Sequence, residues 1–312
     1  MNTTYDEKIK REIEIYKNNK NVSSDLPDIF HYWSNKYLKE MYTVIDTNVK
    51  DTISLYVYYI KKFKNKSKIL IGSFGSGNCN IEIEIAKKLI EEDCYNFEFN
   101  CIDINIEMLK RGRKSAEENN LVDKFKFIKS DIRDWKTNNK YDIFITEAAL
   151  HHFVELEALF NKINLYMTDE GYFVINDTIG KNGHARWPET LNFINKIWNT
   201  LPKAKKYNHQ FKRICDPYLN WDCTDPHGTP NFEGIRAQDI LPLLIKYFNF
   251  ESVIWWGGLI EVFIDRGYGH NYIKNNIDDC KFIDNIHKLN EICIELNLIK
   301  PTQIIGAVKK KV

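Results

Sequence analysis

Residues 68–89 of the chain read KILIGSFGSGNCNIEIEIAKKL. The apolar residues 69–71 lead directly into a glycine-rich turn, 72–77, and then into a segment whose apolar residues have helical spacing. Glycine lets the backbone approach a ligand closely, and the N–H groups at the start of a helix attract an anionic group. A strand, a glycine turn and a helix in this order favour a nucleotide-like ligand, although glycine turns alone are common.

Two aspartates end the next two apolar segments, FEFNCID at Asp103 and FKFIKSD at Asp131. The carboxyl ends of parallel strands meet at one crevice, so we expect both acids to lie near the glycine turn. Asp103 can accept hydrogen bonds from both ribose hydroxyls of a nucleoside. Asp131 can accept one from an adenine amino group, with Ile104 and Ile132 on the two faces of the ring. Either aspartate by itself could instead cap a helix.

Residues 68–177 resemble the class I S-adenosylmethionine-dependent methyltransferases, whose pattern is a strand, a G-x-G-x-G turn, a helix and acidic ends of strands two and three. Gly75 and Gly77 match the last two glycines, and Ser73 stands where the first is usual. The acidic residue that often precedes the first glycine is absent, because Ile71 and Gly72 occupy that neighbourhood. A looser likeness links other segments to stand-alone bacterial methyltransferases that act on small molecules or glycans.

The resemblance implies S-adenosyl-L-methionine as cofactor. Trp33 and Tyr37 could close over its methionine end, or they could instead pin an N-terminal helix to the sheet. The implied cofactor site consists of Gly72, Ser73, Gly75, Gly77, Asp103, Ile104, Asp131, Ile132, Glu147, Trp33 and Tyr37.

Strand and helix patterns alternate from residue 68 to 177, which predicts an α/β fold with a doubly wound, mostly parallel sheet. The family pattern adds a seventh, reversed last strand near residues 301–309. We expect four parts: an N-terminal helical segment or lid (1–64), a cofactor-binding core (65–178), a substrate lid inserted after strand five (179–235), and the rest of the core sheet (236–312). Residues 5–18 have the pattern of an amphipathic helix.

Composition predicts a soluble cytoplasmic enzyme. The chain has 312 residues and a net charge of +1, so no overall field attracts nucleic acid. Its seven cysteines form no C-x-x-C pair, which is typical of reduced thiols. We expect neither a signal peptide, since the first residues are polar, nor a membrane span. The turn Thr146-Glu-Ala-Ala also lacks the Asn/Asp-Pro-Pro-aromatic motif that seats a flipped base.

Methyl transfer to a hydroxyl needs a base, and histidine titrates near neutrality. His151 and His152 follow the fourth strand, and His184 follows the fifth, so each could reach an acceptor at the rim of the sheet. Each could instead pack beneath the nucleoside or cap a helix. We therefore expect O-methylation of a small polar metabolite or glycan, with one of these histidines as base.

Several alternatives remain open at this stage. Glu147, Asn176 and Asp177 could hold Mg²⁺, but carboxylates at strand ends more often cap helices, so we expect no metal. N-methylation of a peptide or small amine, a nicotinamide-dependent oxidoreductase, and a non-catalytic binding protein on the same fold are other possibilities. The oligomeric state does not follow from the sequence.

Overall fold

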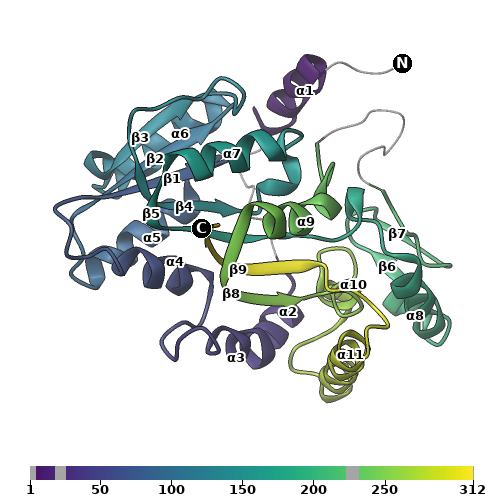
Figure 1. Cartoon of the computed structure of the whole chain (residues 1–312). Coiled ribbons are helices and arrows are strands. Elements are labelled where there is room, and N and C mark those ends of the chain that lie inside the picture. The colour runs from purple at the N-terminus through teal and green to yellow at the C-terminus, as the bar shows by residue number, and fades with distance from the viewer. Residues whose placement is uncertain (1–4, 18–25, 223–231, 312) are drawn as a thin grey trace.

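The computed structural model describes residues 5–17, 26–222 and 232–311. Its centre is a seven-stranded sheet in the order β3-β2-β1-β4-β5-β9-β8 (Figure 1). β9 runs antiparallel to both of its neighbours, and the other six strands share one direction. The expected α/β fold with a mostly parallel sheet and a reversed last strand is confirmed.

The strands are β1 Ile69–Phe74, β2 Phe97–Asp103, β3 Phe125–Lys129, β4 Tyr141–Glu147, β5 Met167–Thr178, β8 Phe248–Trp256 and β9 Gln303–Lys310, with a separate hairpin of β6 Tyr207–Asn208 and β7 Arg213–Ile214. The α-helices are α1 Tyr5–Lys17, α2 Asp28–Trp33, α3 Lys39–Tyr42, α4 Thr52–Lys61, α5 Asn80–Glu91, α6 Ile106–Glu118, α7 Leu156–Tyr166, α8 Pro188–Trp198, α9 Ala237–Tyr247, α10 Glu261–Ile264 and α11 Ile277–Glu295. Two 3₁₀ turns, η3 Leu150–His152 and η4 Asn182–His184, follow β4 and β5.

Both faces of the sheet are covered, because successive side chains of a strand point to opposite faces. In β4, Ile143 and Ile145 join the core beneath α4 and α5, whereas Phe144 joins the core beneath α7 and α9. Figure 1 shows these two helix pairs on opposite sides of the sheet. Strands that are buried on both faces read as near-continuous apolar runs, which is the pattern that the sequence has.

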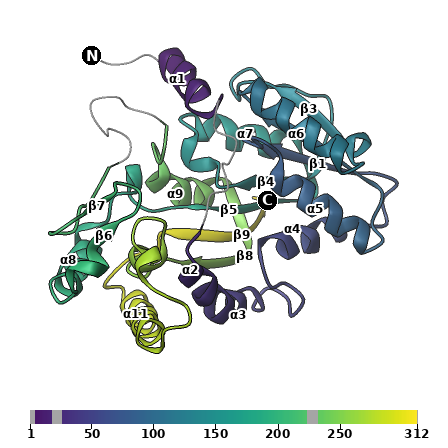
Figure 2. The same cartoon turned by 180° about the vertical axis from the view of Figure 1, so that it is seen from behind.

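The expected N-terminal helical segment (1–64) consists of several separate helices. The helical stretch that ends with α3 stops at Tyr42. Helix α4 begins only after Asp51, whose side chain accepts a hydrogen bond from Ser54 N at 2.7 Å. The Ser54 hydroxyl in turn accepts from Asp51 N, which completes a capping box. Figure 2 shows α2 and α3 near α11 at the β8 end of the sheet.

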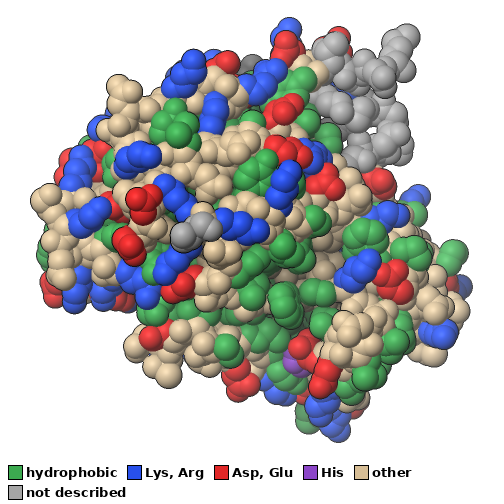
Figure 3. All heavy atoms as spheres, viewed as in Figure 1, with side chains coloured by type: hydrophobic (Ala, Val, Ile, Leu, Met, Phe, Trp, Pro, Cys, Tyr) green, Lys and Arg blue, Asp and Glu red, His purple; other side chains and the backbone are tan. Residues whose placement is uncertain are grey.

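The surface carries charges of both signs. On the face in Figure 3, Lys and Arg side chains are interspersed with Asp and Glu. Among the residues that the structure describes, no helix combines the length and the apolar character that crossing a bilayer would require.

Phe144 should contribute strongly to stability. Its side chain is fully buried and stacks on Phe74, with ring centroids 5.4 Å apart. We expect Phe144→Ala to lower the free energy of unfolding by about 3–5 kcal/mol, through lost burial and the cavity that remains. Urea denaturation measures this loss. Leu165→Ala, at a residue that is 58% exposed on α7, is the matched control and should change stability little.

Candidate active site

A cavity of about 450 Å³ lies at the carboxyl edge of the sheet. Its walls come from the turn after β1, the ends of β2 and β4, the loop after β3, and one side of α1. This volume lies within the range of small-molecule sites in proteins. The cavity therefore occupies the position in an open α/β sheet where ligands bind.

The glycine turn approaches the cavity because two of its residues adopt a backbone that L side chains avoid. Gly75 has φ +67° and Gly77 has φ +52°. A Cβ on Gly75 would lie 2.7 Å from Ala149 Cβ, and one on Gly77 would lie 2.9 Å from Met108 Cε. Both positions therefore favour glycine for conformation, and Gly75 also for space, since Met108 Cε is the movable end of a flexible side chain.

Asp103 fastens this turn to the end of β2. Its Oδ2 accepts from Gly77 N at 2.8 Å, and its Oδ1 accepts from Asn105 N at 2.7 Å. Burial raises the pKa of Asp103, and the two backbone hydrogen bonds oppose that shift. An ionised carboxylate offers about four acceptor positions, so both oxygens keep capacity for a ligand.

Asp131 lies just past β3 and is paired within the protein. Its carboxylate accepts two hydrogen bonds from the guanidinium of Arg133, one from Nε to Oδ1 at 3.2 Å and one from Nη2 to Oδ2 at 3.0 Å. The same guanidinium lies 3.8 Å from the ring centroid of Tyr5. Asp131, Ile104 and Ile132 all line the cavity, so this wall combines a paired acid with apolar side chains.

Helix α1 closes one side of the cavity. The apolar positions of its amphipathic pattern, Tyr5, Ile9, Ile13 and Tyr16, all line the cavity. A helix that would otherwise expose an apolar stripe thus gains burial by covering a ligand site.

Glu147, the last residue of β4, is a half-buried acid on the cavity wall. Its Oε2 accepts from Tyr56 Oη at 2.8 Å and its Oε1 from Asn176 Nδ2 at 3.0 Å. Burial raises the pKa of Glu147 to about 8, against the lowering effect of those two hydrogen bonds. At neutral pH this carboxyl is therefore largely protonated.

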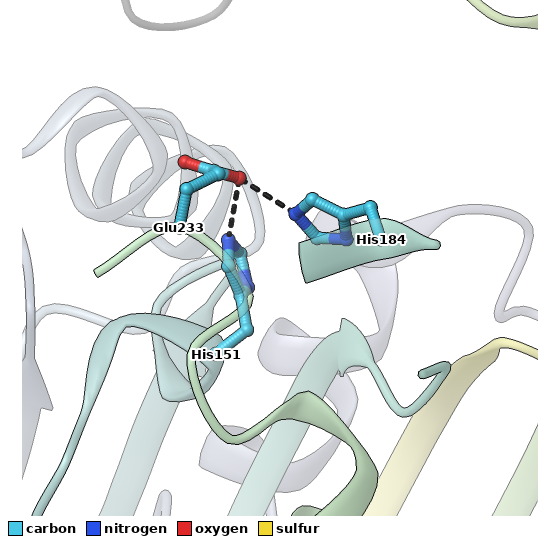
Figure 4. A group of neighbouring side chains, drawn as sticks. All are labelled: His151, His184 and Glu233. Atoms are coloured by element: carbon cyan, nitrogen blue, oxygen red, sulfur yellow. Dashed lines mark hydrogen bonds and ion pairs between the residues drawn. The ribbon is translucent and has the colours of Figure 1, made fainter. Parts of the chain in front are cut away.

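The three histidines of the strand rims lie together around Glu233, a residue just before α9. Figure 4 draws two of them, His151 and His184, with Glu233. Glu233 Oε1 lies 2.7 Å from His184 Nε2 and 3.4 Å from His151 Nε2. His152 Nε2 lies 3.4 Å from Glu233 Oε2, and its Nδ1 lies 2.8 Å from Glu12 Oε1. His152 lines the cavity, whereas His151 and His184 lie behind it.

Charge balances this cluster. Burial lowers the pKa of His151, but Asp177, 2.7 Å from its Nδ1, and Glu233 raise it to about 10. Conversely, burial raises the pKa of Glu233, but hydrogen bonds from His151 and His184 hold it far below its ordinary value. The raised pKa of His151 and the lowered pKa of Glu233 therefore favour opposite charges on these two side chains.

The sequence around this site matches a known protein family. Residues 73–216, which include the glycine turn, both aspartates and all three histidines, match the family model described as "Methyltransferase domain". The chain carries a methyltransferase domain.

Two solved structures are similar in fold to this methyltransferase domain and its surroundings. Geranyl diphosphate C-methyltransferase from Streptomyces coelicolor A3(2), in complex with Mg²⁺, geranyl diphosphate and S-adenosyl-L-homocysteine, has 8% sequence identity and a TM-score of 0.49, with 100% of each chain covered. A SAM-dependent methyltransferase from Thiobacillus denitrificans, in complex with S-adenosyl-L-homocysteine, has 9% identity and a TM-score of 0.45, with 92% of this chain and 100% of that chain covered. Because both TM-scores lie below 0.5, we draw no conclusion from either. No curated protein sequence matches the chain.

Four residues expected at the cofactor site lie elsewhere in the methyltransferase structure. Trp33 is fully buried against His287 of α11, and the Tyr37 hydroxyl donates to Asp284 of the same helix at 2.8 Å. The hypothesis that they close over a cofactor is therefore not supported, because packing on α11 holds both away from the cavity. The alternative, in which they pin N-terminal helices to the rest of the fold, describes these contacts.

Gly72 and Ser73 support the turn of the methyltransferase domain without lining its cavity. A Cβ on Gly72 would lie 2.5 Å from Phe144 Cε1, so glycine there serves packing inside the sheet. The Ser73 hydroxyl donates to Glu82, which is buried in α5 and lines the cavity.

Three acids of the site are absent from the sequence predictions: Glu12, Glu82 and Glu233. Burial raises the pKa of Glu82 to about 7, but the sequence Ile81-Glu82-Ile83-Glu84 does not show which glutamate faces inward. Glu12 lies among the charges of α1, and Glu233 lies far from the strand rims in sequence. Only the fold brings them to the site.

The raised pKa of Glu147 makes a prediction about stability. Since its folded-state pKa of about 8 exceeds the ordinary 4.5, its contribution to stability is fully present below pH 4.5 and is lost as the pH rises through 8. Glu147→Gln removes this titration. The stability of the variant relative to the native chain should therefore increase with pH, by at most about 1.4 kcal/mol per pH unit.

Urea unfolding at pH 5, 6, 7 and 8 measures that difference. Glu170→Gln, at an exposed position on β5, is the control and should give no such trend. A Glu147→Gln difference that stays constant over this range would contradict the assignment of a buried neutral carboxyl.

Proposed function

We propose that the chain transfers a methyl group from S-adenosyl-L-methionine to an oxygen of a small polar metabolite or a glycan. The observation that carries this proposal is the cavity at the carboxyl edge, where Gly75, Gly77, Asp103 and Asp131 meet within the methyltransferase domain. S-adenosylmethionine supplies an activated methyl group on a sulfonium, so the protein has chiefly to align the acceptor and to exclude water.

The residues present fit this cofactor. The turn lacks side chains at Gly75 and Gly77, so its backbone can lie against the cofactor. Asp103 is placed to accept from ribose hydroxyls, while Ile104 and Ile132 offer apolar surface to an adenine ring. Glu82 and Glu147 form an acidic lining, and a cationic group bound nearby would favour their ionised form.

His152 is the histidine that we propose as the base. It lines the cavity, and Glu12 Oε1 lies 2.8 Å from its Nδ1. Its Nε2, which lies 3.4 Å from Glu233 Oε2, would accept the proton of the acceptor hydroxyl. His151 and His184 are less suited, because neither of them lines the cavity.

The segments that cover the acceptor side are α1 and the two ends of segment 179–235. Phe232 at one end lines the cavity, and His184 at the other end contacts the neighbouring Glu233 at 2.7 Å. Helix α8 in the middle of the segment does not line the cavity, since Trp198 is buried against Phe263 and Tyr268. We therefore propose α1, together with Leu26, as the N-terminal part of the lid.

Cofactor binding tests the proposal directly. Calorimetry should show binding of S-adenosylmethionine to the native chain. Asp103→Ala should weaken it at least tenfold, about 1.4 kcal/mol, because hydrogen bonds to the ribose and the anchor of the turn are both lost. Asp169→Ala, at an acid outside the cavity on β5, is the control and should bind normally.

Binding of NADH without binding of S-adenosylmethionine would favour the oxidoreductase alternative. Thermal melting of Asp103→Ala shows whether the variant stays folded. If it is folded and binds S-adenosylmethionine as the native chain does, the assignment of Asp103 is wrong.

The base is tested by turnover on a panel of sugars and hydroxylated metabolites, measured as release of S-adenosylhomocysteine. His152→Gln should lower kcat by roughly 10²–10⁴-fold while leaving the affinity for S-adenosylmethionine within a few-fold. His209→Gln, at an exposed histidine outside the cavity, should leave both unchanged. If His152→Gln keeps its kcat on an oxygen acceptor, another group takes the proton.

A further inference from the structure

Three potential metal ligands converge on one point beside the cavity. His151 Nε2, His184 Nε2 and a carboxylate oxygen of Glu233 all lie within 4.8 Å of one another. Figure 4 shows both imidazole rings directed at the same carboxylate oxygen. The three come from separate segments, namely η3 after β4, η4 after β5, and the residues before α9.

Backbone hydrogen bonds hold these three segments together. Gly183 N donates to Gly234 O at 2.9 Å, and Ile235 N donates to His151 O at 3.1 Å. Glu233 is thus fixed to both histidine segments through the residues that follow it. His184 has φ +57°, a left-handed backbone that a histidine seldom adopts. The positions of the ligands are therefore set by the fold rather than by the side-chain contacts alone.

Asp177 fixes which nitrogen of His151 is available. Its Oδ1 lies 2.7 Å from His151 Nδ1, and its Oδ2 accepts from the backbone N–H groups of Ala149 and Leu150. With Nδ1 holding its proton against Asp177, a metal ion that displaces the proton of Nε2 would meet a lone pair on that nitrogen. Metal-binding histidines usually have this arrangement, in which a carboxylate or carbonyl holds the second ring nitrogen.

The spacing suits a small divalent ion. Ligands at 2.0–2.1 Å in tetrahedral geometry are roughly 3.4 Å apart. His151 Nε2 and Glu233 Oε1 are 3.4 Å apart. His184 Nε2, now 2.7 Å from the same oxygen, would need to move by less than about 1 Å, and its side chain is one-third exposed.

We propose that His151, His184 and Glu233 bind one divalent transition-metal ion, with Zn²⁺ the best match. Two imidazole nitrogens select Zn²⁺ and its neighbours over Mg²⁺ and Ca²⁺, which prefer oxygen ligands. This site differs from the Mg²⁺ site of Glu147, Asn176 and Asp177 that the sequence suggested. Asn176 donates a hydrogen bond to Glu147, and Asp177 is hydrogen-bonded to His151.

Three protein ligands leave a fourth position open, as in catalytic rather than structural zinc sites. His184 and Glu233 are both partly exposed, so water or an acceptor oxygen could reach that position. His152, on the cavity wall, has its Nε2 3.4 Å from Glu233. The ion would thus lie next to the proposed base, where its open position could bind an oxygen of the methyl acceptor. The inference goes beyond the proposed function, since metal binding is measurable without methyl transfer.

Metal binding by the full-length chain tests this inference. After treatment with EDTA and its removal, calorimetry with ZnCl₂ should show one bound ion, and MgCl₂ should give no binding. CoCl₂ should produce the visible absorption of low-coordinate Co²⁺. His184→Ala and Glu233→Gln should each weaken Zn²⁺ binding by roughly 100-fold or more, because each removes a ligand.

His209→Ala removes a histidine that contacts Asn271 far from Glu233 and should leave Zn²⁺ affinity unchanged. Calorimetry with S-adenosylmethionine on His184→Ala separates the two proposals, because this variant should keep the cofactor and lose the metal. The inference is overturned if the native chain binds Zn²⁺ no more tightly than folded His184→Ala, or if His209→Ala loses as much affinity.

Discussion

The parallel pairing of β1 with β2 and β4 is the constraint on which the candidate site depends. Ser73 pairs with Cys101 on one side and with Ile145 on the other. This register brings the ends of three strands to the same height, so the loops that follow them share one edge of the sheet. The hydrogen bond from Gly77 N to Asp103 then joins the first loop to the end of the second strand. The cavity is the space between these loops, and α1 covers it.

Burial governs the electrostatics of this edge. On the cavity wall, Glu82 and Glu147 are removed from water and their pKa values rise to about 7 and about 8. The half-buried Glu233 contrasts with them, because hydrogen bonds from His151 and His184 hold its pKa far below the ordinary value. The site thus contains neutral and ionised carboxyls side by side. Glu82 and Glu147 favour a cationic ligand, and Glu233 holds the histidines in place by its contacts with them.

The outcome at particular residues shows how far sequence patterns reach. Asp103 and the glycines of the turn lie where their spacing placed them, because a strand, a turn and the next strand form a local unit. Trp33 and Tyr37 do not, since an aromatic pair fits a lid and a helix interface equally well, and α11 is 250 residues away in sequence. The pattern of α1 predicted a helix with an apolar stripe but not the surface that the stripe would cover.

The sequence by itself determined the order of strands and helices along the chain and the turn with its two aspartates, whereas the reversed last strand followed from the family resemblance. The element order and the turn depend on contacts between near neighbours or on the alternation of apolar residues, which the chain displays directly. Only the tertiary structure decided which acids face the cavity and which histidine lines it. It also decided that Glu233 meets residues after β4 and β5. Those positions depend on how distant segments pack, and a charged residue in a loop carries no local signal of the partner that it will find.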